Sequence, residues 1–226
     1  SRRSDKLRME KMKMENSMIR IRKILCFLLP LTALFLASCE EVQEAGKYDN
    51  WQARNEAFID SIARETGGLI IDSEEKVSAV EVGRLFAIPT TAGTMSGDQY
   101  VYCKKITANP DGRRPLYTES VSAYYYGTLI TGDRFDGNFI GYSALDQGTL
   151  NATDKAPTEF DVPSEISVSD VIAGWTAALQ LMKTGERWML YVPYQSGYGT
   201  SGSGSIIGYS ALAFDLELVE VVDDED

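Results

Sequence analysis

The stretch from Ala211 to Val222 constrains the fold more than any other part of this chain. It alternates two sets of side chains, Leu212, Phe214, Leu216 and Leu218 against Ala213, Asp215, Glu217 and Val219. A period of two is typical of an antiparallel strand with one buried face and one face in water. Stretches rich in Tyr, Val, Ile and Phe recur at 100–107, 119–130, 158–162 and 186–192. The sequence therefore predicts five antiparallel strands.

One helix is predicted among these strands, from Ser169 to Met182. Its apolar residues fall on one side of a helical wheel, and Gly185 follows its end; they are Val171, Ile172, Trp175, Ala178, Leu179 and Met182. A single amphipathic helix among antiparallel strands predicts an α+β fold in which the helix covers one face of the sheet.

A second helix is predicted ahead of the strands, at about 51–65. Asp49 and Gln52 have the spacing of a capping box, and Gly67-Gly68 would end the helix. Its apolar side chains lie mostly on one side: Trp51, Phe58, Ile59 and Ile62. We expect the helix to pack on the domain, with contact to a partner or a second copy as the alternative. Residues 69–98 receive no functional assignment.

Charge separates the N-terminal segment from the rest of the chain. Residues 1–38 hold nine basic and three acidic residues, whereas the remainder holds 13 basic and 30 acidic ones. A basic stretch leads into 14 mostly apolar residues, Ile24 to Ala37, a length that suits a secretion signal and is short for a membrane span. Leu36-Ala37-Ser38-Cys39 resembles a bacterial lipobox, which predicts lipidation of Cys39 with a fatty acid such as palmitate. An ordinary signal peptide or a short anchor helix is the alternative.

These features divide the chain into six segments. We expect a non-native or upstream-start extension at 1–17, a lipoprotein signal peptide at 18–38 and a tether at 39–48. An N-terminal extension with one amphipathic helix would follow at 49–98. The main domain would span 99–222, and an acidic tail 223–226.

Composition excludes several classes of site. The 226 residues include no histidine, so a Ser-His-Asp or Cys-His relay and any zinc site with histidine ligands cannot form. The net charge of −11 argues against a nucleic-acid-binding protein. Loss of Cys26 with the signal and lipidation of Cys39 would leave Cys103, which we interpret as a buried structural residue on a strand.

Four ordered blocks carry a family resemblance over about residues 100–222. They are Ser120 to Leu129 with Gly132 and Phe135-Asp136, Val171 to Trp175 with Ala178 to Met182 and Gly185, Arg187 to Pro193 with Gly197 to Gly199, and Ala211 to Leu218. Taken together they resemble the FKBP-type peptidyl-prolyl cis-trans isomerases, and the lipobox ahead of them resembles a bacterial, Bacteroidetes-like lipoprotein form. The resemblance implies an antiparallel twisted sheet wrapped on one short helix.

The resemblance also implies a site and its ligands. Trp175 would form the floor of an apolar cup, the backbone N–H of Ile172 and the hydroxyl of Tyr198 would bind substrate carbonyls, and Asp136 would lie at the rim. The walls would comprise Tyr125, Phe135, Val171, Ile172, Tyr198 and Phe214, with Ile206 or Ile207 reaching in and Thr158 at a position often held by an aromatic residue. Tyr124 and Tyr126 should face the other side of their strand. The implied partners are proline-containing polypeptides, the membrane through the lipid and a rapamycin-type macrolide; no cofactor or metal is implied.

Two departures from the family keep other functions open. The segment from Gly137 to Pro157 is longer than usual and is expected over the rim of the pocket, and the loop from Gly197 to Tyr209 is rich in Gly and Ser. One alternative is a catalytically weak module that binds extended or proline-containing segments. The other is a surface lipoprotein that captures glycans or proteins through exposed aromatic residues.

Overall fold

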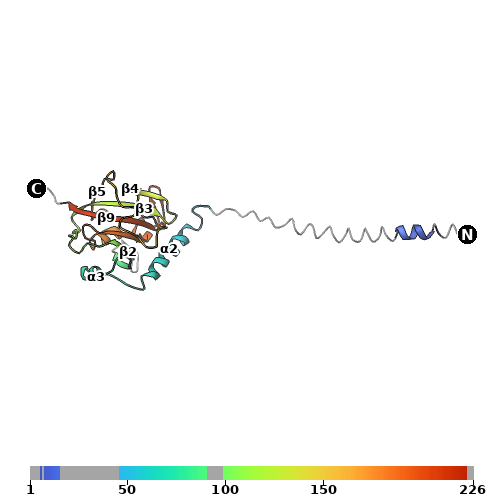
Figure 1. Cartoon of the computed structure of the whole chain (residues 1–226), viewed down its shortest axis with the longest axis horizontal. Coiled ribbons are helices and arrows are strands. Elements are labelled where there is room, and N and C mark those ends of the chain that lie inside the picture. Colours follow the sequence, from blue (N-terminus) through green and yellow to red (C-terminus); the bar gives the residue numbers. More distant parts are fainter. Residues whose placement is uncertain (1–5, 7, 16–45, 91–98, 223–226) are drawn as a thin grey trace. The chain divides into compact units, whose positions relative to one another are not determined.

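The computed structural model describes residues 6, 8–15, 46–90 and 99–222. Residues 8–15 are helical, and the chain from Asn50 onward forms a separate compact unit (Figure 1). No helix among the described residues is long and apolar enough to cross a membrane. The predicted signal segment, Cys39 and most of the predicted tether lie outside the described residues.

The compact unit contains thirteen elements within the described ranges. In chain order they are α2 (Trp51–Glu65), α3 (Glu74–Ser78), β1 (Leu85–Thr90), β2 (Gln99–Thr107), β3 (Ser120–Leu129), β4 (Arg134–Gly137), β5 (Ser164–Ser167), α4 (Ala173–Leu179), β6 (Arg187–Val192), the 3-10 helix η1 (Tyr194–Ser196), β7 (Gly202–Ser203), β8 (Ile206–Ile207) and β9 (Leu212–Val222).

Seven of the strands form one antiparallel sheet. Its order is β1-β2-β6-β9-β3-β4, and β5 pairs with β3 beside β4 (Figure 1). The predicted antiparallel sheet is confirmed, and four of its five predicted strands correspond to β2, β3, β6 and β9. β1 and β4 had not been predicted, and the stretch 197–209 contains the small hairpin of β7 and β8.

The predicted strand at 158–162 is wrong. The carboxylate of Asp161 accepts hydrogen bonds from the backbone N–H and the hydroxyl of Thr158, at 2.7 and 2.8 Å. The N–H of Asp161 donates to the carbonyl of Thr158, which closes a turn. The strand begins later, at Ser164, because this Asp-centred turn occupies the backbone before it.

The sheet has an apolar cluster on each face. α4 covers one face, where its Trp175, Ala178 and Leu179 pack with the buried side of β9. This helix is only seven residues long, because Ile172 caps it in an extended conformation with ψ of 149° and Gln180 ends it. The predicted bounds 169–182 are therefore too wide: Val171, Ile172 and Met182 of the predicted stripe lie outside α4, although all three pack in or against the same apolar cluster.

The other face of the sheet is covered by α2 and by part of the segment 137–157. Ile62 of α2 packs with Tyr142, Ala144 and Ala213 in the second apolar cluster. Ala213 and Asp215 are therefore buried, and the expectation that this side of the last strand faces water is wrong there. The expected position of the long segment over the pocket rim is also wrong, since Tyr142 and Ala144 pack on the opposite face.

α2 matches the helix predicted at 51–65, and its packing on the domain is as expected. Asn55 fixes it, because its Nδ2 donates to the carbonyl of Trp51 and its Oδ1 accepts from the N–H of Ala211, at 2.7 and 2.8 Å. The predicted capping box is wrong: the N-cap is Asn50 with φ of 52°, and no side chain caps the helix. The carboxylate of Asp49 accepts a hydrogen bond from the N–H of Gly46 instead.

Candidate functional site

An aromatic cavity of about 250 Å³ opens between α4 and the strands β3, β4 and β9. The side chains around it come from parts of the chain that are up to 89 positions apart. They are Tyr125, Phe135, Asp136, Ile166, Asp170, Val171, Ile172, Trp175, Tyr198 and Phe214.

Four aromatic rings meet edge to face in this cavity. The ring centroids of Trp175 and Phe214 are 5.1 Å apart, those of Tyr125 and Trp175 are 5.4 Å apart, and those of Phe135 and Phe214 are 5.4 Å apart. Trp175 lies in the middle of this chain of contacts and is only 4% exposed. Edge-to-face packing fixes each ring through its neighbours, so the wall is preorganised around an apolar floor.

The start of α4 places a hydrogen-bond donor at the cavity. The carbonyl of Ile172 accepts from the N–H groups of Trp175 and Thr176, at 2.9 and 3.1 Å. Its own N–H, one residue before the helix, donates to no group among the described residues. Gly174 allows α4 to lie close to β6, since a Cβ there would be 2.7 Å from Cγ1 of Val192. A free backbone donor at a helix start suits a ligand carbonyl oxygen.

Asp136 and two tyrosines form the polar rim. The Tyr125 hydroxyl donates to Oδ2 of Asp136 at 3.2 Å, and the N–H of Gly137 donates to Oδ1 at 2.7 Å. Burial, with the negative charge of Asp136, raises the pKa of Tyr125 and of Tyr198. Both hydroxyls are therefore neutral donors at neutral pH. Asp136 therefore lies at the rim of the cavity and also holds the backbone of Gly137.

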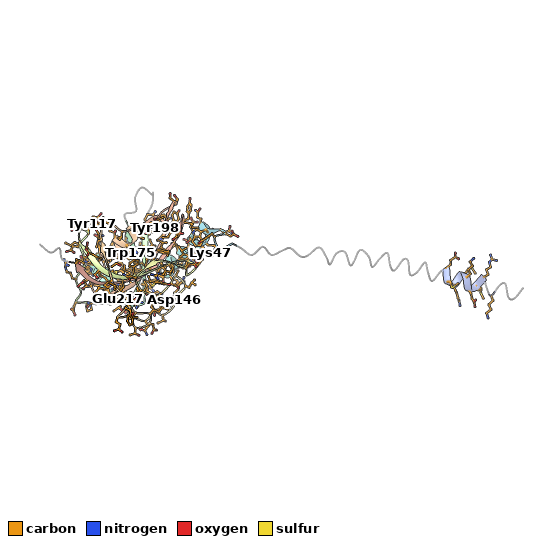
Figure 2. All side chains as sticks on the ribbon, turned by 90° about the horizontal axis from the view of Figure 1, so that it is seen from above. Lys47, Tyr117, Asp146, Trp175, Tyr198 and Glu217 are labelled. Atoms are coloured by element: carbon orange, nitrogen blue, oxygen red, sulfur yellow. The ribbon has the colours of Figure 1, made fainter. Side chains whose placement is uncertain are left out.

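Tyr198, labelled in Figure 2, lies in the loop that follows η1. The backbone around it is held by hydrogen bonds from Gly199 N–H to the Tyr194 carbonyl and from Gly202 N–H to the Tyr198 carbonyl, at 2.8 and 3.1 Å. The side chain is 39% exposed, and its hydroxyl has no partner among the described residues. The side chain is therefore positioned by an ordered loop while its hydroxyl stays available to a ligand.

Eight of the eleven predicted site residues surround this cavity, and three do not. Ile206 is buried in the apolar cluster beside α4, Ile207 is 38% exposed on β8, and neither lines the cavity. Thr158 is exposed in the turn with Asp161 and does not form a wall. The roles of the eight residues at the cavity remain predictions.

Two lining residues, Ile166 and Asp170, had not been predicted. Ile166 lines the cavity where Thr158 does not, because β5 rather than 158–162 pairs with β3. The two-residue spacing of Ile166 and Val168, just ahead of the helix motif, could have indicated a strand there. Tyr124 and Tyr126 face away from the cavity as predicted and pack against Phe139, with centroids 6.1 and 6.5 Å apart.

The chemistry available in this cavity is binding and desolvation. Within the described ranges no group of three or more Cys, Asp or Glu side chains could hold a metal ion. The lining contains two carboxylates, Asp136 and Asp170, and no basic residue. Cys103 is fully buried on β2, where burial raises the pKa of its thiol well above the ordinary value. The cavity therefore suits a compact apolar ring flanked by carbonyl groups.

The chain is similar in sequence to known proteins. Residues 112–219 match the model of the family described as FKBP-type peptidyl-prolyl cis-trans isomerase. The chain is 34% identical over 148 residues to the macrophage infectivity potentiator of Trypanosoma cruzi, a match that covers 63% of this chain and 64% of that protein. It is 34% identical over 128 residues to the FKBP-type peptidyl-prolyl cis-trans isomerase FkpA of Aeromonas hydrophila, covering 57% of this chain and 39% of the relative.

A solved structure, the peptidyl-prolyl cis-trans isomerase of Pseudomonas syringae, is 24% identical with a TM-score of 0.48 and covers 76% of this chain and 96% of its own. The matched region spans less than two thirds of the two curated relatives named above. The family match covers α4, with Trp175 in it, and the strands β3, β4 and β9 up to residue 219, where the other aromatic rings lie. Residues 112–219 of the chain form a domain of the FKBP-type peptidyl-prolyl cis-trans isomerase family.

Proposed function

We propose that this protein is a peptidyl-prolyl cis-trans isomerase that assists the folding of exported proteins. The observation that carries the proposal is the preorganised group of four aromatic rings around Trp175, with neutral donors at its rim. The proline ring of a client polypeptide would enter the cup. Its flanking carbonyl groups would accept hydrogen bonds from the Ile172 N–H and the Tyr198 hydroxyl.

Such a site can accelerate isomerisation without an acid, a base or a metal. The barrier to rotation about the peptide bond is about 18–20 kcal/mol, because the planar amide is stabilised by resonance. The twisted amide loses that delocalisation and carries less charge on its oxygen. A dry aromatic cup therefore favours it relative to the planar form, which water solvates better. Uncatalysed isomerisation takes about 10–100 s, slow enough to limit folding.

The experiment is to follow isomerisation of a short X-Pro peptide with the full chain and two variants. We expect Trp175→Ala to reduce kcat/KM at least about 100-fold through loss of the floor, and Tyr198→Phe to reduce it about tenfold through loss of one hydrogen bond. Tyr117→Phe is the matched control, because Tyr117 is exposed and away from the cavity. A folded wild-type chain that gives no acceleration would overturn the proposal.

The catalytically weak binding module is the second candidate. It is favoured by the absence of Ile206 and Ile207 from the cavity lining, which leaves a bound segment fewer apolar contacts than expected. Saturable binding of an X-Pro peptide with no acceleration would support it. A macrolide of the rapamycin type is a useful competitor in the same assay, because by family resemblance it would occupy the cup.

We further propose that the protein is exported and anchored to the cell envelope by a lipid on Cys39, with an outer-membrane location. The basic stretch, the apolar run and the lipobox-like Leu36-Ala37-Ser38-Cys39 support this. The test is the intact mass of the protein recovered from bacterial membranes. Wild type should carry a fatty-acylated Cys39 at its N-terminus, whereas Cys39→Ala should lack the lipid and lose membrane association. Cleavage without acylation would favour an ordinary signal peptide.

A further inference from the structure

A second cavity, distinct from the aromatic cup, lies against the opposite face of the sheet. It encloses about 210 Å³ between α2, the start of β2 and η1. Its lining combines tyrosines, carboxylates and amides with three less polar residues: Asn55, Glu56, Ile59, Asp60, Gln99, Tyr100, Tyr102, Pro193, Tyr194, Gln195 and Ala211. It shares no residue with the cup.

The charged side chains that line this cavity are all negative. Glu56 and Asp60 are one helical turn apart on α2, so both carboxylates lie on the same side of the helix. Burial is the main cause that raises the pKa of Tyr102 and of Tyr194. The negative charge of Asp60 raises the pKa of Tyr102 further, and that of Glu56 raises the pKa of Tyr194 further. No lysine or arginine lines the cavity, and neither carboxylate forms an ion pair within the described residues.

The rest of the lining contains tyrosine rings and an amide oxygen, which can also interact with a cation. Tyrosine rings attract cations through their faces, and three of them line this cavity. The side-chain carbonyl oxygen of Gln195 is buried with no hydrogen-bond partner among the described residues. A buried acceptor left unsatisfied is costly unless a donor reaches it. A ligand that brings several N–H donors on a flat positive group would meet the carboxylates, the rings and this oxygen together.

The walls are held in place before any ligand arrives. The hydroxyls of Ser196 and Thr90 are hydrogen-bonded at 2.8 Å, and the Ser196 hydroxyl is 3.2 Å from the carbonyl of Tyr100. These bonds tie η1 to β1 and β2, while Asn55 ties α2 to the chain just ahead of β9. A preformed cavity reduces the ordering that binding would otherwise require.

The size of the cavity limits what can enter. Sites for whole small molecules are generally about 300–1,000 Å³, so this one suits a single side chain better than a complete cofactor. We propose that the second cavity binds one arginine side chain of a partner polypeptide, with the guanidinium between Glu56 and Asp60 and against the tyrosine rings. Arginine is favoured over lysine because its planar group stacks on rings and donates in several directions.

The probe is a proline-free peptide, acetyl-Gly-Arg-Gly-amide, titrated into the full chain and followed by NMR of the backbone amides. We expect saturable shifts at the lining residues, weaker binding of the lysine peptide and no binding of the peptide with citrulline, which is neutral and nearly isosteric with arginine. The double variant Glu56→Gln/Asp60→Asn should weaken binding at least about tenfold, because both charge-assisted contacts are lost.

The matched control is Glu75→Gln/Glu81→Gln, which removes two negative charges from exposed positions outside this cavity. Equal weakening by both double variants would reduce the effect to net charge and overturn the proposal. Equal binding of the citrulline peptide, or no saturable shift at millimolar peptide, would also overturn it. Because the probe lacks proline, each result is independent of whether the aromatic cup catalyses isomerisation.

Discussion

Gly127 shows how a single missing side chain shapes the aromatic cup. It lies in β3 opposite Phe214 and Asp136, and a Cβ there would be 2.7 Å from Cζ of Phe135 and 2.9 Å from Cε1 of Phe214. Neither ring can retreat freely, because each is packed against its neighbours at the cavity. The edge-to-face contacts of the cup therefore depend on glycine at this strand position.

We expect Gly127→Ala to lower the free energy of unfolding by about 1–3 kcal/mol, the usual range for overpacking a filled interior. It should also reduce isomerisation of the X-Pro peptide, since both displaced rings line the cavity. Denaturant unfolding and kcat/KM measure the two effects. Gly148→Ala is the control, because a Cβ at Gly148 would meet nothing within 4 Å; equal effects of the two changes would contradict this explanation.

The segment 137–157 is held on the sheet by a buried ion pair. The Arg187 guanidinium on β6 pairs with the Asp215 carboxylate on β9, with Nε to Oδ1 at 2.7 Å, and both side chains are at most 2% exposed. The same guanidinium donates to the carbonyls of Ala152 and Lys155, at 3.2 and 2.9 Å, and Oδ2 of Asp215 accepts from the N–H of Tyr142 at 2.8 Å. The pair therefore connects two central strands to the long segment.

Asp215→Asn should lower the free energy of unfolding by about 3–5 kcal/mol, because it leaves the Arg187 charge buried without its counter-charge. Hydrogen exchange should accelerate first in 137–157, while the cup around Trp175 keeps its protection. Asp72→Asn is the matched control, since Asp72 pairs with Lys76 at 2.7 Å on the exposed surface and such pairs contribute little. A loss no larger than that of the control would mean that apolar contacts alone hold the segment.

The sequence predicts individual helices and strands better than it predicts which residues contact one another across the fold. β9 was predictable because its side chains alternate from Leu212 to Val219, and α2 because its apolar residues lie mostly on one side of the helix. Burial of Asp215 was not, because its partner Arg187 is 28 positions away and looks like any polar residue of a strand. Thr158 was misassigned for a related reason: the local turn with Asp161 decides where β5 begins, and that hydrogen bond leaves no periodic signal.

Most of the cup could be predicted because the family motifs fix Trp175, Tyr125 and Phe214 through their order along the chain. The second cavity could not be predicted, since it depends on how α2, β2 and η1, which are far apart in the sequence, are arranged in the fold. Figure 2 places Asp146, within the long segment, away from Trp175 and Tyr198. Tyr142 and Ala144 of this segment pack on the face opposite the cup.

Buried and half-buried groups across the molecule ionise only at alkaline pH. Burial raises the pKa of the Cys103 thiol and of the hydroxyls of Tyr102, Tyr191 and Tyr198 above ordinary values of 9.0 and 10.0. The folded state thus keeps protons that the unfolded chain releases. The stabilisation is complete below the unfolded pKa values and is lost as pH rises through about 9 and 10 toward the folded values.

Tyr191 contributes to this loss, because its side chain is fully buried and its hydroxyl has no hydrogen-bond partner among the described residues. We expect Tyr191→Phe to be neutral or slightly stabilising at pH 7, since it removes an unsatisfied polar atom. At pH 11 the variant should be distinctly more stable than wild type, because the unfolded chain no longer gains by ionising that tyrosine. Denaturant midpoints at pH 7 and pH 11 measure both effects, with Tyr117→Phe as the exposed control. Parallel pH dependence in wild type and Tyr191→Phe would show that the alkaline loss arises elsewhere, with Cys103→Ala the next variant to compare.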